Sequence, residues 1–343
     1  MRAGPGGAVR APPDPRVFWP VMTDNPVSEA DSDAAVKAPP RLNPAAMDAK
    51  TANIIYHDWE ARSYDDKWSI SFDERCTSYA REKFCKIAPN RRYGKVLEIG
   101  SGTGFFIINL TQAGLVSEPY ATDISQGMVD VCLRNARNVG IENMQGRAVD
   151  AENLPFEDDF FDLVVGHAVL HHLPDVPGAL KDAFRVLKPG GAIVVAGEPT
   201  RIGFKIVSAA KRATAIGMKT VGARFGLTRA STKAAGGADP ESVLEAHVDL
   251  HEFHPHMVRQ WAREAGFTNI RVETEEFFSG LFGWSVRTVE ALARPGLLGD
   301  KWAWFAYRNY LRLYAFDDKV TRRILPKPLF YNLLLYAEKP AND

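Results

Sequence analysis

Short apolar runs alternate with helical patterns through the middle of the chain. The apolar runs predict β-strands at 95–99, 119–122, 145–149, 161–166 and 192–197. The stretches between them predict helices, notably at 125–139 and 176–187. Because the runs are nearly continuous, both faces of the resulting sheet are expected to be covered. The alternation therefore predicts an α/β fold with a parallel sheet, whose ligands bind beyond the carboxyl ends of the strands.

The first of these strands ends in a glycine-rich turn. The stretch from Val96 to Gly104 is Val-Leu-Glu-Ile-Gly-Ser-Gly-Thr-Gly, and a helical pattern opens at Phe105. A strand that turns through glycines into a helix brings a ligand close to bare backbone at the helix N-terminus. A dinucleotide-binding turn would have its third glycine where Phe105 stands, so the spacing disfavours a nicotinamide dehydrogenase.

The predicted strands also end at residues with useful chemistry. Asp123 follows Glu98 by 25 positions and ends the second strand, where a carboxylate can hold a ribose diol through two O–H···O⁻ hydrogen bonds. Asp150 follows the third strand, His167 ends the fourth and Glu198 ends the fifth. Since the carboxyl ends of parallel strands meet at one edge, we expect these side chains to share one site.

The bulk composition restricts the function classes. The 343 residues include 42 basic and 42 acidic ones, so no overall charge draws the chain to nucleic acid. Three widely spaced cysteines form no CxxC pair, which favours a reducing compartment and disfavours structural zinc. No apolar run reaches the ~18 residues of a membrane span, and the N-terminus has no apolar signal region. We therefore expect a cytoplasmic protein with no nucleic-acid partner.

The turn and the acid before it resemble motif I of class I S-adenosyl-L-methionine (SAM)-dependent methyltransferases. The resemblance is strongest to the ubiquinone/menaquinone-biosynthesis-like small-molecule methyltransferases, and it rests on Asp150–Phe156, Val169–Leu173 and Arg185–Gly191. It covers the core from 95 to 200 and the rest only loosely. It implies a Rossmann-like seven-strand sheet, mostly parallel with the last strand antiparallel, a SAM cofactor and methyl transfer to a small molecule.

The resemblance also implies a set of cofactor-binding residues. In such enzymes Asp150 would accept a hydrogen bond from the adenine amino group, and the N–H of Ala151 would donate to the ring. A tyrosine face can hold a sulfonium cation, which favours Tyr64 in the helical segment before the core, although these aromatic residues can also simply pack on the core. The predicted set is Tyr64, Glu98, Gly100, Ser101, Gly102, Gly104, Asp123, Ile124, Met128, Asp150, Ala151 and His167.

Histidines supply the candidate catalytic groups. An oxygen or carbon acceptor must lose a proton, and His167 is the first candidate base because the tip of the fourth strand borders the transferable methyl group in this fold. Glu198 is the second candidate and His171 the third. His171 and His172 are also candidates for the pocket wall or for capping. A later group, His247, His251, His254 and His256, has no matched carboxylate spacing, so no metal site is predicted.

Segments outside the core are expected to set the substrate. Residues 1–50 hold nine of the 22 prolines and are predicted to be disordered. A methyltransferase domain is predicted at 51–343. Its predicted parts are a helical cap (52–90), the SAM-binding core (91–200), a basic amphipathic insertion (200–254) and a C-terminal part (255–343) with an aromatic helical insertion (277–326). In the last part we expect a helix at 255–266, a strand at 269–273 and a closing strand at 329–338.

The two insertions suggest the acceptor. At helical pitch Arg201, Lys205, Arg212 and Lys219 share one face, and the opposite face carries Ile206, Val207, Ala210, Ala213, Val221 and Phe225. Such a helix predicts either peripheral membrane contact through 201–229 or packing on the domain with a solvated basic face. Both insertions leave from the carboxyl edge of the sheet, so both are predicted to roof the active site. An aromatic roof suits a lipophilic acceptor, although aromatic residues at helical spacing also form ordinary cores.

Two other functions stay open. One is a non-catalytic, methyltransferase-like SAM-binding module that docks on a membrane or an anionic partner. The other is an RNA or protein methyltransferase, which is disfavoured by the zero net charge and by Gly166-His167-Ala168-Val169, where such enzymes carry an Asn-Pro-Pro-Tyr-type motif. No oligomeric state follows from the sequence.

Overall fold

The computed structural model describes residues 47–342, except 69, 229–247, 249 and 295. Most of the predicted disordered segment, part of the basic insertion and His247 therefore lie outside the described residues. Helix α2 (Ala49–Glu60) begins inside the segment predicted to be disordered, because Asp48 caps it by accepting a 3.0 Å hydrogen bond from the N–H of Thr51. Within the described part of the chain, no helix is both long and apolar enough to cross a bilayer.

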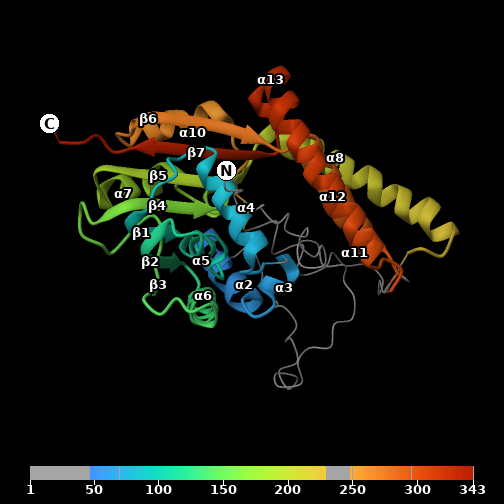
Figure 1. Cartoon of the computed structure of the whole chain (residues 1–343), viewed down its shortest axis with the longest axis horizontal. Coiled ribbons are helices and arrows are strands. Elements are labelled where there is room, and N and C mark those ends of the chain that lie inside the picture. The colour runs from blue at the N-terminus through green and yellow to red at the C-terminus, as the bar shows by residue number, and fades with distance from the viewer. Residues whose placement is uncertain (1–46, 69, 229–247, 249, 295, 343) are drawn as a thin grey trace, which may run out of the picture.

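The described residues form one seven-stranded sheet in the order β3-β2-β1-β4-β5-β7-β6 (Figure 1). β7 pairs antiparallel with both of its neighbours, and the other pairs are parallel. The predicted Rossmann-like sheet with an antiparallel last strand is confirmed. The strands are β1 (Tyr93–Ile99), β2 (Val116–Asp123), β3 (Gln145–Ala148), β4 (Phe161–His167), β5 (Leu187–Pro199), β6 (Thr268–Glu275) and β7 (Asn332–Glu338).

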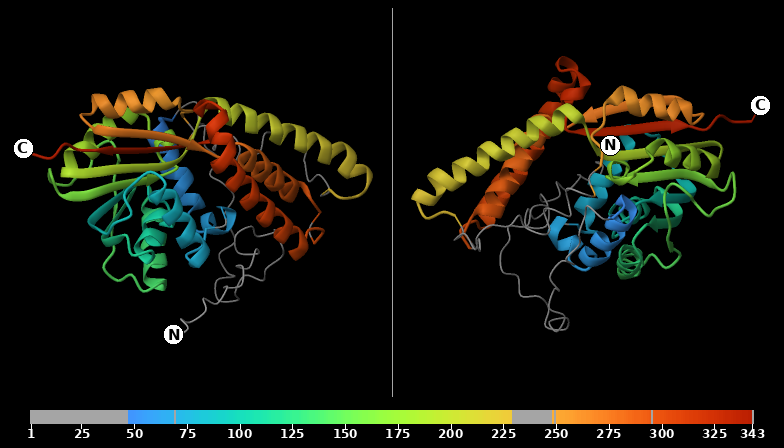
Figure 2. Two further views of the ribbon diagram at one scale, coloured as in Figure 1. Left: turned by 45° about the horizontal axis from the view of Figure 1, so that its top comes forward. Right: turned by 180° about the vertical axis from the view of Figure 1, so that it is seen from behind.

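Helices cover both faces of this sheet, as its apolar strands require (Figure 2). On one face, Phe84, Ile107 and Cys132 of three helices join a buried cluster with β1, β4 and β5. On the other face, Leu180 and Val258 of two helices join a second cluster. The helices of the first face are α4 (Glu74–Cys85), α5 (Phe105–Gln112) and α6 (Gln126–Asn138), and those of the second are α7 (Val176–Val186) and α10 (Pro255–Glu264).

The main departures from the predicted boundaries lie around β5 and β7. β5 continues back through the turn at Gly190 to Leu187, and a register shift interrupts its pairing with β7 near Gly197, whose φ is +79°. β7 begins at Asn332 rather than at 329, because a 3₁₀ turn, η5 (Lys327–Leu329), precedes it. The other elements agree with the predicted ranges within a few residues.

Beyond the carboxyl ends of the strands lies a layer of long helices, which extends away from the sheet (Figures 1 and 2). α11 contacts both of the other two long helices. The layer consists of α8 (Arg201–Gly217) with the π-helical turn η3 (Met218–Gly222), α11 (Phe278–Leu292), and α12 (Asp300–Phe316) with the π-helical turn η4 (Asp317–Thr321) and α13 (Arg322–Ile324). Two shorter elements, α3 (Tyr64–Trp68) and η2 (Leu170–His172), lie near the strand ends.

The basic insertion packs on the domain at its start, which agrees with one of its two predicted alternatives. α8 packs on α11, and Val207 in its second turn is buried. Further along, Ile216, Val221 and Phe225 are 60% or more exposed. Packing on the domain therefore holds for the start of the insertion, and an uncovered apolar surface follows it.

Candidate active site

A cavity of about 400 Å³ lies at the carboxyl ends of β1, β2 and β4. Eleven of the twelve predicted cofactor-binding residues line it. The exception is Gly104, which caps α5 with φ +96° and closes the turn from behind. The cavity continues past His167 to a second wall made by α4, α11, α12 and the residues just before β7.

The glycine turn forms the floor of the first half of the cavity. Gly100 has φ +59°, and a Cβ atom there would lie 2.1 Å from a methyl group of Val169, so no larger residue fits. Beneath the turn, the buried carboxyl of Glu98 accepts a 3.0 Å hydrogen bond from the N–H of Ile107 in the first turn of α5. Burial raises the pKa of Glu98 well above its usual range. Glu98 therefore fixes the turn to the helix.

Asp123 closes one side of this half. Its carboxylate accepts hydrogen bonds from the N–H groups of Gly102 at 2.8 Å and Ser125 at 2.9 Å. Burial raises the pKa of Asp123 to about 6 despite these donors. The carboxylate is thus oriented by backbone, in the position where the sequence predicts a ribose-binding acid.

Asp150 has a partner that the sequence did not indicate. The ammonium group of Lys50 in α2 lies 2.6 Å from the Asp150 carboxylate and 2.5 Å from that of Glu152. Lys50 also lines the cavity, next to buried Ala151. The predicted adenine end is therefore covered by the N-terminal helix, through an ion pair that no local pattern reveals.

His167 stands where the two halves of the cavity meet. Its ring packs between those of Phe105 and Phe106, with centroid distances of 5.2 and 5.3 Å. Burial lowers the pKa of His167 to about 4, and the nearby Lys83 ammonium acts in the same direction. The imidazole is therefore neutral at pH 7. The next residue, Ala168, has φ +54°, a strained conformation at the cavity wall.

Glu198 and His171 do not fit the predicted role of catalytic bases. Glu198 is fully buried, and its carboxylate accepts hydrogen bonds from the N–H groups of Val169 and Leu170 at 2.8 and 2.9 Å. It also lies 2.8 Å from Nδ1 of His171. Neither residue lines the cavity. The end of β5 points the Glu198 carboxylate into η2, the turn that follows β4, so Glu198 holds that turn in place.

The N-terminal helices supply the opposite side of the first half. Tyr64 lies over Gly102, with a ring carbon 3.9 Å from the position that a Cβ atom there would take. His57 and His172, which the sequence did not single out for the cofactor, line the cavity with ring centroids 5.6 Å apart. Burial lowers the pKa of His57 to about 4 and that of His172 well below its usual value, so both rings are neutral at pH 7.

The second half of the cavity is aromatic with a few polar groups. Tyr79 of α4, Trp284 of α11, Tyr310 of α12 and Tyr331 line it. One cation, Arg287, is among them, with its guanidinium carbon 5.8 Å from the Trp284 ring, and burial lowers its pKa. Residues of the aromatic insertion thus line the cavity, whereas no described residue of the basic insertion does. Tyr79 comes from a part of the chain that the sequence assigned to the cap.

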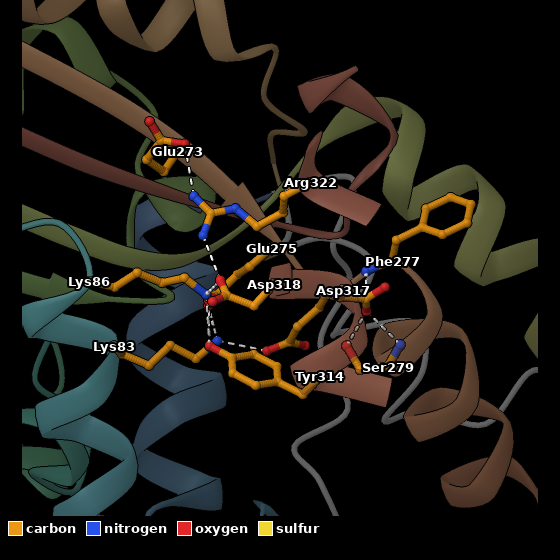
Figure 3. A network of polar contacts seen from close by, with 11 residues as sticks. Lys83, Lys86, Glu273, Glu275, Phe277, Ser279, Tyr314, Asp317, Asp318 and Arg322 are labelled. Atoms are coloured by element: carbon orange, nitrogen blue, oxygen red, sulfur yellow. Dashed lines mark hydrogen bonds and ion pairs between the residues drawn. The ribbon is translucent and has the colours of Figure 1, made fainter. Parts of the chain in front are cut away.

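A buried ionic network holds this second wall together (Figure 3). Lys83 of α4 pairs with Glu275 at the end of β6 and, at 2.7 Å, with Glu276. Lys86 lies 2.9 Å from Glu275, which also accepts a 2.7 Å hydrogen bond from the hydroxyl of Tyr314 in α12. Burial raises the pKa of Glu275, but the two ammonium groups outweigh it and hold the pKa at about 2.

A second carboxylate orients α11. Asp317 is buried and accepts hydrogen bonds from the N–H groups of Phe277, Phe278 and Ser279 at 3.0, 3.1 and 2.9 Å (Figure 3). These are donors at the N-terminus of α11, where an anion is stabilised by the helix dipole. α12 and its continuation therefore fix the start of the helix that carries Trp284 and Arg287.

The late histidines form no metal site among the described residues. No group of three or more His, Cys, Asp or Glu side chains suitable for a metal ion occurs in the described ranges. The rings of His254 and His256 have centroids 4.3 Å apart, and His247 lies outside the described residues.

The first half of the cavity fits a SAM molecule. Three buried polar atoms of residues in its wall, Oγ of Ser101, Oγ1 of Thr103 and Nδ1 of His57, have no hydrogen-bond partner among the described residues. A polar ligand, such as the amino and carboxylate groups of SAM, would satisfy such atoms. The neutral imidazoles and the Tyr64 face impose no positive charge where a sulfonium would lie.

Comparison with known proteins agrees with this fit. A family model described as a methyltransferase domain matches residues 97–195. The chain contains a class I SAM-dependent methyltransferase domain. The matched residues run from β1 to β5 and include the glycine turn, Asp123, Asp150 and His167. The cofactor of this domain is SAM, which supplies a methyl group on a sulfonium.

The similar proteins share this domain rather than the whole chain. A demethylmenaquinone methyltransferase of Staphylococcus saprophyticus is 37% identical over 139 residues, which cover 40% of this chain and 58% of that protein. A ubiquinone/menaquinone biosynthesis C-methyltransferase of Haemophilus ducreyi is 37% identical over 107 residues, which cover 31% and 41%. The chain spans about half the length of the curated relatives it matches.

A solved structure shows the same fold over a longer stretch. Phosphoethanolamine N-methyltransferase 2 of Haemonchus contortus aligns with a TM-score of 0.53 at 13% identity, and the alignment covers 87% of this chain and 61% of that one. At this identity the likeness concerns the fold alone.

Proposed function

We propose that this protein transfers a methyl group from SAM to a small lipophilic acceptor bound in the aromatic half of the cavity. The observation that carries the proposal is the continuity of the cavity. One wall has the glycine turn, Asp123 and Asp150, the other has Trp284, Tyr310 and Tyr331, and His167 stands between them. A cofactor and an apolar acceptor would therefore meet at His167.

The residues suit a reaction driven by alignment. Methyl transfer from a sulfonium is an in-line displacement, and holding two reactants in line and excluding water can supply up to ~7–11 kcal/mol. In this proposal the aromatic wall holds the acceptor and the glycine turn and Asp123 hold the cofactor. The neutral His167 accepts a hydrogen bond from the acceptor's nucleophilic group, but a pKa of about 4 makes it a weak base at pH 7.

The relatives support a lipophilic acceptor. Two of them are named for demethylmenaquinone and for ubiquinone/menaquinone biosynthesis, which concern quinone compounds. The aligned residues belong to the cofactor domain, so the support is indirect. The aromatic side chains of α11 and α12, which lie outside the matched residues, provide the independent argument.

We further propose that the protein is cytoplasmic and contacts a membrane through 201–229. The exposed cations Arg212, Lys219 and Arg224 lie along the part of this segment whose apolar residues Val221 and Phe225 are uncovered. A basic surface with exposed apolar side chains is typical of peripheral membrane contact. A lipophilic acceptor would be available there.

The test uses SAM labelled in its methyl group. The full chain is incubated with a cell extract, which is then separated into organic, aqueous small-molecule and macromolecular fractions. We expect label in the organic fraction with the natural protein and none with Asp123→Ala. Label in the macromolecular fraction would overturn the small-molecule proposal. SAM binding by calorimetry without transfer to any fraction would favour the non-catalytic module.

A further inference from the structure

The charge of this protein is unevenly distributed. The helical layer, taken as 201–228 and 278–324, has fourteen basic and four acidic residues and a formal charge of +10. Because the whole chain has a net charge of zero, the remainder carries −10. The layer therefore presents a local positive potential that the overall composition conceals.

The cations of α12 and its continuation lie along one exposed stripe. Lys301, Arg308, Arg312, Lys319 and Arg323 follow one another at helical spacing, and each is exposed. None of them forms an ion pair with another described residue, whereas two acids of the segment, Asp317 and Asp318, are engaged elsewhere. Asp317 caps α11, and Asp318 pairs with Lys86 and Arg322.

Large apolar side chains accompany these cations. Phe305 is 51% exposed, Phe316 45% and Leu311 41%, all on α12 itself. Ile324, at the end of α13, is 72% exposed. We define the α12 outer face as Lys301, Phe305, Arg308, Leu311, Arg312, Phe316, Lys319, Arg323 and Ile324.

The opposite side of the same helix serves the cavity. Tyr310 is buried and lines the aromatic half, and α12 packs on α11, which contributes Trp284. A surface that held the α12 outer face would therefore lie one helix thickness from the acceptor wall.

We propose that the α12 outer face docks the protein on an anionic lipid bilayer. The cations face the acidic headgroups, and Phe305, Phe316 and Ile324 enter the boundary with the acyl chains. This inference deepens the proposed function, because it would bring a membrane-dissolved acceptor to the cavity. The α12 outer face would be a second docking element, besides the segment 201–229.

Charge and apolarity together favour a bilayer over a nucleic acid. Either partner would accept the cations, but aliphatic side chains such as Leu311 and Ile324 gain little against phosphate and sugar. In a bilayer each buried apolar group contributes in addition to the charge attraction. The mixture of cations with aliphatic and aromatic groups therefore fits lipid.

The test measures cosedimentation of the full chain with vesicles. Vesicles of phosphatidylcholine alone are compared with vesicles containing 30% phosphatidylglycerol, and the variant is Arg308→Gln/Arg312→Gln/Lys319→Gln. Each lysine or arginine near an anionic surface is worth about 1 kcal/mol, so losing three should weaken binding to the anionic vesicles about 100-fold. A second variant, Phe305→Ser/Phe316→Ser, should weaken the binding to anionic vesicles that the natural protein retains at high salt, where the charge attraction is screened.

A matched control removes three exposed cations outside the helical layer. Arg137→Gln/Arg147→Gln/Lys181→Gln should bind as the natural protein does. Equal loss in both triple variants, or equal binding to neutral and anionic vesicles, would overturn the proposal. Preferential binding of a single-stranded RNA probe by the α12 outer face would overturn it in favour of nucleic acid, and a concentration-dependent dimer lost in the α12 variant would assign the face to self-association.

The outcome is separate from catalysis. SAM binding by calorimetry should be unchanged in the triple variant, because none of its residues lines the cavity. If the natural protein transfers no methyl group and the triple variant loses vesicle binding as expected, the proposed function fails and the docking face stands. If methyl transfer is present and vesicle binding is unchanged, the docking face fails alone.

Discussion

The two halves of the cavity are built in different ways. The cofactor half comes mostly from the ends of neighbouring strands, and its main contacts are between residues close in the fold's repeating unit, such as Gly102 and Asp123. The acceptor half is assembled from α4, α11, α12 and Tyr331, and its main link joins Lys83 to Glu275 across 192 positions of the chain. The first half rests on backbone geometry, and the second on a buried ionic network.

This difference predicts how each half fails. Backbone N–H groups that orient a carboxylate remain in place when a distant contact is lost. A buried ion pair is costly to break, because the remaining partner keeps its charge without compensation. Changes in the network should therefore lower stability and disturb the acceptor half, whereas changes at the strand ends should act mainly on SAM.

The largest effect is expected for Lys83→Met. It leaves Glu275 and Glu276 buried with one cation fewer, and losing one partner of a buried pair costs about 3–5 kcal/mol of unfolding free energy. Denaturant unfolding should show this loss at pH 7. SAM affinity of the folded variant should change little, which would separate the two halves.

A surface pair provides the control for this variant. Lys188→Met removes the partner of Asp162 at 2.8 Å, in an ion pair that is partly exposed, and should cost at most about 1 kcal/mol. The pKa of Glu275, held at about 2, also predicts the direction in which stability changes with pH. Its ionised form stabilises the fold above the unfolded pKa of 4.5, and this contribution is lost as the pH falls from 4.5 towards 2. A similar loss in both variants would show that the network is not essential.

The next effect concerns Asp123→Asn and the cofactor alone. We propose that the Asp123 carboxylate accepts hydrogen bonds from the ribose of SAM. Replacing it by an amide removes the charge from these bonds, so SAM binding should weaken about 100-fold, or roughly 3 kcal/mol. In the natural protein, affinity should also fall as the pH drops below about 6, because protonation of Asp123 removes the same charge. The variant should lack this pH dependence.

Calorimetry of SAM binding between pH 5 and 8 measures both effects. Asp130→Asn, an exposed acid of α6 that is bonded to Gln126, serves as the control and should behave as the natural protein. A natural affinity that is flat across this range would contradict the role of Asp123, because its carboxyl would then not take part in binding.

The sequence predicts the first half well, for a physical reason. Parallel strands bring their carboxyl ends to one edge of the sheet, so a motif at the end of a strand has a known position in the fold. Positive φ at Gly100 and the acid at Asp123 are local requirements, and local requirements leave local patterns. The same reasoning was wrong at Glu198, because a one-dimensional pattern does not show that the side chain turns towards Val169 and Leu170.

For the second half, the sequence predicted the kind of wall but not the residues that form it. The aromatic content of 277–326 indicated an apolar wall, but not which residues face the cavity. Tyr79, Lys50 and His57 contribute through packing of the N-terminal helices, and no spacing in the sequence relates them to α11 or to Asp150. Long-range pairs of this kind depend on tertiary packing, which neither propensity nor periodicity encodes.

A smaller effect is expected for Arg287→Met in the acceptor half. Arg287 contributes a buried guanidinium to this wall, and its loss should raise KM for the acceptor recovered from the organic fraction about tenfold. SAM affinity should stay the same, since Arg287 belongs to α11 beside Trp284, in the proposed acceptor half. Arg294→Met, an exposed change just beyond the same helix, is the control. An equal rise in KM for both variants would exclude a specific contact.

The smallest effect is expected for His167→Gln, at the boundary between the halves. Because burial lowers the pKa of His167 to about 4, the imidazole is already neutral at pH 5 and titrates below the range of the assay. Glutamine keeps a hydrogen-bond acceptor of similar reach, so kcat should fall only a few-fold, and the profile of kcat between pH 5 and 8 should keep its shape. Loss of a rate-limiting ionisation near pH 6.5 in the variant would show instead that His167 gains and loses a proton during turnover. In that case proton transfer at His167, and not the alignment of cofactor and acceptor, would limit the rate.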